Sequence, residues 1–123
     1  MSVFYAAFAG TQASAGAVFS KLAFSKFPYD QAPFLFAISL LGFFLTNALM
    51  WWSHAKALAT SSSTIVPILV NTGVNFICTG ILGHFFFDEV HAMLWWFGLS
   101  LVIVGCAVVG SEGEDLAKTK KTE

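Results

Sequence analysis

Charged residues are scarce in this sequence. Asp, Glu, Lys and Arg make up 11% of its 123 residues, whereas 57% are hydrophobic and 16% are aromatic. Soluble domains carry roughly twice this share of charge, so the composition excludes an ordinary soluble domain. The net charge of −1 comes with no basic patch carrying interleaved aromatic residues, which excludes nucleic-acid binding. The sequence therefore predicts a membrane protein whose first partner is the lipid bilayer.

The sequence also lacks recognisable sets of catalytic or metal-binding residues. Cys78 and Cys106 fall in the middle of apolar segments, without the spacing of a metal site or a disulfide framework. His54, His84 and His91 share no ligand spacing, and no Ser/His/Asp, Cys/His or paired-carboxylate set is placed to react. We therefore predict no catalytic residue, no metal site, no cofactor and no enzyme activity.

Apolar runs of spanning length separate the few charged stretches. Crossing the hydrocarbon takes about 20 helical residues, so we expect an all-α membrane protein with a bundle of four transmembrane helices. This bundle forms one domain over residues 1–110, and its expected helices cover about 3–24, 33–52, 63–87 and 93–110. Trp51-Trp52 and Trp95-Trp96 lie where aromatic belts at the two membrane surfaces are expected.

The segment 63–87 is apolar, yet it carries amides. Asn71, Asn75 and Thr79 follow one another at steps of four and share one helix face. Because lipid offers an amide no partner, this face either bonds to other helices or lines a water-accessible pathway, and the sequence leaves both open. Gln12 is another amide, inside the first segment. The candidate pathway-lining residues are therefore Gln12, Asn71, Asn75 and Thr79.

Small residues form helical stripes in the first and last segments. In segment 3–24 they recur at Ala6, Gly10, Ala13 and Ala17, which favours close approach of a neighbouring helix. Gly98 and Gly105 stand a heptad apart among branched aliphatic residues and predict a helix-packing or dimer contact. An alternative for the first segment is a cleaved signal peptide, which the absence of a positive n-region and the three further spans disfavour.

Lysines indicate the orientation in the membrane. Four spans place both ends of the chain on one side, with Lys56, Lys118, Lys120 and Lys121, and leave Lys21 and Lys26 on the other. This bias favours cytosolic termini. Residues 111–123 are charged and poor in apolar residues, which predicts a disordered cytosolic tail. Its Lys120-Lys121-Thr122-Glu123 sequence matches a dilysine retrieval signal and suggests the endoplasmic reticulum or another endomembrane.

Several blocks of sequence together resemble one family. The blocks are Ser20-Lys21-Leu22-Ala23-Phe24, Thr46-Asn47-Ala48-Leu49-Met50-Trp51, the serine run at 61–63, Phe85-Phe86-Phe87-Asp88-Glu89 and Leu94-Trp95-Trp96-Phe97-Gly98. In order and spacing they resemble the eukaryotic transmembrane protein 42 family. That family is similar to a four-helix, single-repeat member of the drug/metabolite transporter superfamily, related to EamA-type and small multidrug resistance proteins. The resemblance covers nearly all of residues 3–110.

The resemblance implies a transporter of a small-molecule substrate that acts as a homodimer or larger homo-oligomer, because larger relatives carry two such repeats. It also implies that the block from Gly98 to Gly105 makes the dimer contact and that Asn75 occupies a family asparagine position. The first segment departs from the small multidrug resistance pattern, since it has no carboxylate to couple protons to a cationic drug. The alternative is a non-transporting multi-pass subunit or scaffold that docks other membrane proteins.

Overall fold

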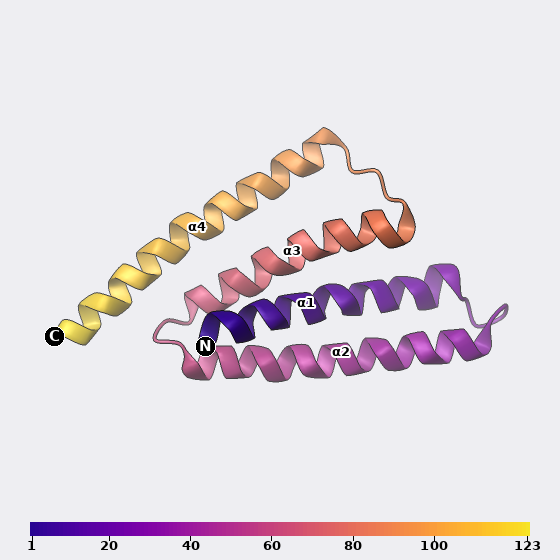
Figure 1. The fold of residues 1–123 in the computed structure, drawn as a ribbon, viewed down its shortest axis with the longest axis horizontal. Helices are drawn as coiled ribbons and strands as arrows, with labels where there is room; N and C mark the ends of the chain where they lie inside the picture. The colour runs from indigo at the N-terminus through magenta and orange to yellow at the C-terminus, as the bar shows by residue number, and fades with distance from the viewer.

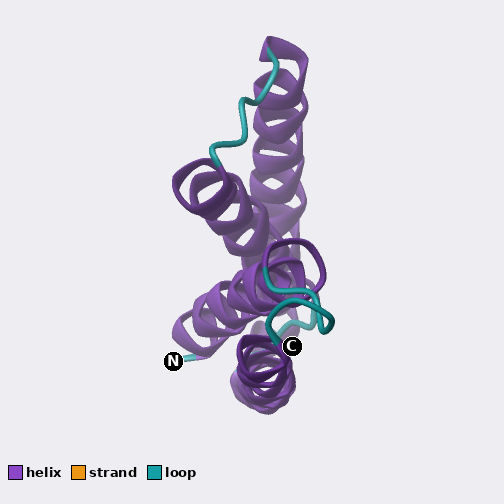
Figure 2. Ribbon diagram, turned by 90° about the vertical axis from the view of Figure 1, so that its right-hand side faces the viewer, coloured by secondary structure: helices purple, strands orange, loops and turns teal.

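The computed structural model describes the backbone of residues 1–123 and every side chain except that of Ala117. The chain folds into helices α1 (Ser2–Lys21), α2 (Pro33–Thr60), α3 (Ile65–Phe87) and α4 (Met93–Thr122), with a π-helical turn at Leu22–Lys26 after α1. Short loops join these helices, and the described residues contain no strand (Figure 2). The all-α class expected from the sequence is confirmed.

Helix α1 lies between α2 and α3 and packs along both of them (Figure 1). Its buried residues are all small: Ala6, Ala9, Gly10, Ser14 and Gly16. Small side chains let two helix backbones approach closely, and the approach is tightest at the glycines. A Cβ on Gly10 would lie 2.6 Å from the Asn71 carbonyl oxygen, and one on Gly16 would lie 2.9 Å from Nδ2 of Asn47.

The ends of α2 and α3 have local causes. Pro33 occupies the first turn of α2. The backbone N–H that proline lacks would have no partner within the helix at this position, so the helix loses no hydrogen bond. Helix α3 ends at Phe87 because Asp88 adopts the left-handed conformation, with φ 50° and ψ 33°. Before α3, the Ser63 hydroxyl oxygen accepts a hydrogen bond of 3.3 Å from the backbone N–H of Ile65.

Helix α4 is set apart from the other helices (Figure 1) and, within the described part of the chain, packs closely on α3 alone. Near its start, the Trp95 indole lies over Gly80 so closely that no Cβ would fit there. Near its other end, a Cβ on Gly110 would lie 3.8 Å from Leu69. Most other described side chains of α4 are exposed, so its outer surface packs on no other described part of the chain.

The last part of α4 differs from the sequence expectation. Instead of a disordered tail over residues 111–123, the structure continues one helix from Met93 through Thr122. Glu, Leu, Ala and Lys, which dominate the region after Gly113, are strong helix formers. Glu114 and Lys118 also stand at the i, i+4 spacing that stabilises a helix. The helix therefore extends about 18 Å past its apolar part, at 1.5 Å per residue.

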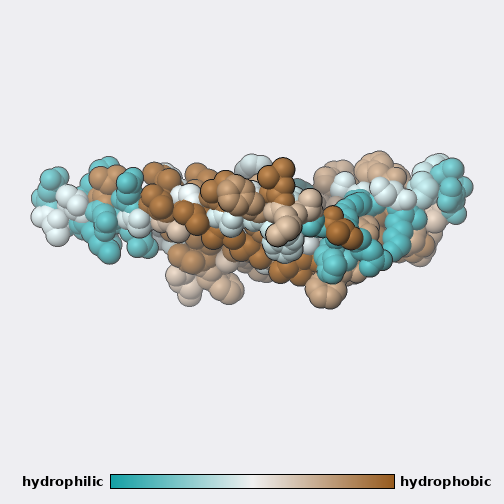
Figure 3. Space-filling model, turned by 90° about the horizontal axis from the view of Figure 1, so that it is seen from above, coloured by the Kyte–Doolittle hydropathy of each residue, from teal (hydrophilic) through white to brown (hydrophobic). Residues whose placement is uncertain are grey.

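Three helices, counted among the described residues, are long and apolar enough to cross a membrane: α2, α3 and α4. Helix α1 is helical over the expected first span, but its alanines, glycines and hydroxyl residues make it less apolar. Large apolar side chains point outward, with Phe34, Phe85 and Leu94 more than 70% exposed. Figure 3 shows an apolar middle between two hydrophilic ends. These features indicate an integral membrane protein.

Candidate functional site

The polar face of α3 lies against α1. Gly10 packs on the backbone of α3 between the two asparagines, since its ideal Cβ position lies 2.6 Å from the Asn71 carbonyl oxygen and 3.0 Å from the Asn75 amide nitrogen. Both asparagines are half-buried there, whereas Thr79 is exposed. Gln12 is half-buried two residues beyond Gly10 on α1. The structure therefore brings the asparagines to the α1–α3 contact, with Gln12 on the neighbouring helix.

Asn71 joins α3 to α2. Its Nδ2 lies 3.2 Å from Nδ1 of His54, so the amide donates to the imidazole nitrogen in the tautomer that leaves Nδ1 unprotonated. The other amide atom, Asn71 Oδ1, is buried and has no hydrogen-bond partner among the described residues. Leaving a buried acceptor unpaired costs about 1–3 kcal/mol. Within the described part of the chain, this oxygen therefore has an unused capacity to accept a hydrogen bond.

Asn75 bonds within its own helix. The Thr79 hydroxyl donates to Asn75 Oδ1 over 3.2 Å, and both residues belong to α3. A bond at i, i+4 stabilises one helix but does not connect two. Of the asparagines on the polar face, Asn71 is thus the one whose side chain connects helices.

An ion pair closes the other end of the α1–α3 contact. The Lys21 ammonium group contacts the Glu89 carboxylate and lies 4.6 Å from the centre of the Phe87 ring. With Thr79 and Gly83, these side chains line a hollow of about 110 Å³. Because about two-fifths of each charged side chain is exposed, the pair contributes at most about 1 kcal/mol. It fastens the end of α1 to the segment between α3 and α4.

The candidate dimer glycines face open space. No described atom lies within 4 Å of the ideal Cβ position of Gly98 or of Gly105, and both residues are exposed on α4. They are therefore accessible to another helix. The candidate retrieval lysines, Lys120 and Lys121, are exposed in the last turn of α4.

Two contacts at the helix interfaces were missed by the sequence analysis. His54 was not foreseen as the partner of Asn71, because nothing in a linear pattern pairs residues 17 positions apart. Asn47 lies against Gly16, and its Nδ2 donates to the Phe43 carbonyl oxygen over 2.8 Å. The sequence signal available for this contact was that Asn47 stands directly after another polar residue, Thr46. In the structure, both side chains face Gly16. Within the described residues, no group of three His, Cys, Asp or Glu side chains is placed to hold a metal ion.

Comparison with known proteins gives no family for this chain. No family model matches it, and no solved structure matches it. The resemblance to the transmembrane protein 42 family therefore stays a prediction from the sequence.

Proposed function

We propose that the chain is a single-repeat membrane transporter of the drug/metabolite type, which crosses the membrane four times and works as a homo-oligomer. The observation that carries this proposal is the unpaired, buried Oδ1 of Asn71 on a polar face of an apolar helix. An asparagine that served only to hold helices together would be expected to use both amide atoms, because an unpaired one costs stability.

The proposed route follows the α1–α3 contact. It starts at Asn71, passes Asn75 and reaches Thr79, next to the hollow that Lys21 and Glu89 line. Gln12 is not part of this route, because it lies four residues before Gly16, the glycine of α1 that contacts α2, and therefore on the α2 side of α1. Unbonded amides offer donors and acceptors to a polar solute in surroundings where lipid offers none.

Helix α1 is proposed as the fourth span despite its lower apolarity. Its 20 residues measure about 30 Å, the thickness of the hydrocarbon core. Because α2 and α3 flank it, much of its surface meets protein instead of lipid. Both ends of the chain then lie on the cytosolic side, and the dilysine motif suggests an endomembrane.

The oligomer is proposed to form through α4. This helix packs on α3 and leaves Gly98 and Gly105 open, with no described atom within 4 Å of their ideal Cβ positions. Small residues in a spanning helix favour close packing with another helix. A second copy seated on α4 would complete a two-repeat assembly.

Water accessibility of the polar face tests the proposed route. In a chain with Cys78 and Cys106 replaced by serine, we expect Asn75→Cys in liposomes to react with a charged, membrane-impermeant thiol reagent. Phe76→Cys is the matched control, because Phe76 is the next residue of α3 and its side chain is 47% exposed on the apolar surface. Equal, low reactivity at both positions would refute a water-accessible route.

A scaffold subunit is the second candidate function. The bond between Asn71 and His54 favours it, since this bond holds α3 to α2 without serving any route. Subunit counting of single complexes in membranes separates the two candidates. Complexes containing one copy with unrelated chains would support the scaffold, whereas complexes containing two copies or more support the transporter.

A further inference from the structure

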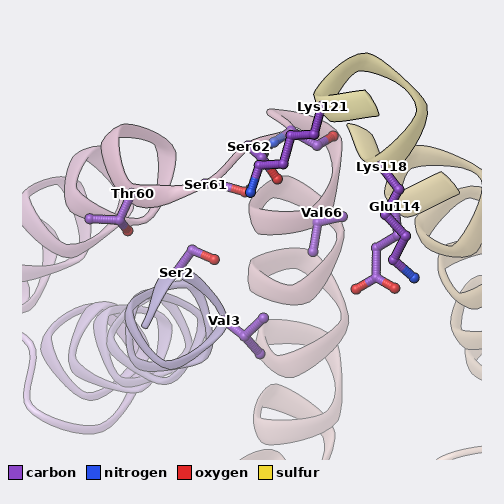
Figure 4. A pocket seen from close by; sticks show the side chains of 10 residues that line it. Ser2, Val3, Thr60, Ser61, Ser62, Val66, Glu114, Lys118 and Lys121 are labelled. Carbon is purple, nitrogen blue, oxygen red and sulfur yellow. Dashed lines mark hydrogen bonds between the residues drawn. The ribbon is translucent and has the colours of Figure 1, made fainter. Parts of the chain in front are cut away.

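A polar hollow lies at the end of the molecule where α2 turns into α3. It has a volume of about 440 Å³ and opens between this turn and the last turns of α4 (Figure 4). Hydroxyl groups and charged side chains line it, among them Ser61, Ser62, Glu114, Lys118 and Lys121. None of the candidate pathway residues lines it, so it is distinct from the proposed route.

The last turns of α4 form one wall of this hollow. Lys118 and Lys121 stand three residues apart, which puts both on one helix face. In Figure 4 the Lys121 side chain extends toward Ser61 and Ser62. Gly113 is buried where α4 meets the turn, and a Cβ there would lie 3.5 Å from the Ser63 hydroxyl oxygen. An unwound tail would not hold Lys121 over the serines.

The charges of the hollow favour an anion. The lining contains two lysines and one carboxylate, that of Glu114, so it carries a net positive charge. Like charges at i, i+3 on a helix repel each other, and an anion between Lys118 and Lys121 would relieve this repulsion. Ammonium and hydroxyl groups donate hydrogen bonds, and charge-assisted bonds to phosphate oxygens are the strong ones. The first turn of α3, which begins at Ile65, adds partial positive charge.

The hollow also lies at the level of lipid headgroups. The apolar part of α4 ends near Gly110, and that of α3 begins at Ile65, so the hollow sits just outside the apolar middle of the molecule. Basic pockets between membrane helices bind phosphate headgroups when they face a leaflet rich in anionic lipids. We infer that this hollow binds the phosphate of an anionic membrane lipid.

Binding of a short-chain lipid to the detergent-purified full chain tests this inference. We expect dioctanoyl phosphatidic acid to bind, as measured by thermophoresis, and dioctanoyl phosphatidylcholine to bind at least tenfold more weakly. Lys118→Gln and Lys121→Gln should each weaken binding of phosphatidic acid about fivefold. Glu114→Gln should tighten it about threefold, because a repelling carboxylate is removed. Added salt should weaken it by screening.

Lys120→Gln is the matched control, since it removes the same charge from the same turn but lines a neighbouring hollow. Unchanged binding in this variant supports the site. A loss equal to that of Lys121→Gln would reduce the effect to general attraction by a basic segment and overturn the inference. Glycerol phosphate binding as tightly as phosphatidic acid would assign the hollow to a soluble phosphate compound and overturn the lipid source. Circular dichroism of each variant checks that its helix content is retained.

Discussion

Replacing Gly10 with alanine tests the packing between α1 and α3. The added Cβ would lie 2.6 Å from the Asn71 carbonyl oxygen and 3.0 Å from the Asn75 nitrogen. Both are backbone atoms, which cannot rotate away as a side chain can. Ordinary contact begins at 3.4 Å, so the two helices must separate by the difference of 0.8 Å. Overpacking of this kind costs about 1–3 kcal/mol.

Gly73→Ala is the matched control, because no described atom lies within 4 Å of its ideal Cβ position. Both substitutions gain the same helix propensity, about 1 kcal/mol, so this gain cancels between the variants. We therefore expect Gly10→Ala to be less stable than Gly73→Ala by about 1–3 kcal/mol. Unfolding in rising mole fractions of sodium dodecyl sulfate, followed by tryptophan fluorescence, measures the difference. Equal stability of the two variants would refute the packing of α1 on α3 at Gly10.

Two further substitutions test other parts of the fold. Gly105→Val should weaken self-association about tenfold, since the loss of one helix contact of about 1.4 kcal/mol corresponds to a factor of ten. A membrane reporter of association measures this change, and an unchanged signal would count against the α4 contact. Asp88→Gly should raise the free energy of unfolding by about 1 kcal/mol, because the left-handed conformation at φ 50° strains a residue with a Cβ but not glycine. The same detergent titration measures this gain, and a loss would mean that the aspartate side chain stabilises the turn.

The apolar parts of the helices were predictable because spanning length and hydrophobicity determine them together. The expected segments start at residues 33, 63 and 93, and the helices of the structure begin at Pro33, Ile65 and Met93; α3 ends at Phe87. The hydrophilic ends were not predictable in this way. Helix α2 continues to Thr60 and α4 to Thr122, because alanine, leucine and lysine sustain a helix without an apolar face.

The polar face of α3 was predictable from the spacing of Asn71, Asn75 and Thr79 alone, because steps of four stay on one face of a helix. Its partners were not, since partners depend on which helices become neighbours. The hydrogen bond to His54 requires α2 and α3 to converge at one end. The contact of Lys21 with Glu89 requires α1 to lie along α3 over its whole length.

The helical end of α4 has a consequence for how its last lysines can be recognised. Adjacent residues of a helix point about 100° apart, and Lys120 and Lys121 accordingly line different hollows. A receptor that binds a dilysine motif in extended form must first unwind the last turn. Unwinding would withdraw Lys121 from the hollow that Ser61 and Ser62 line, so the proposed lipid and such a receptor would compete for one side chain.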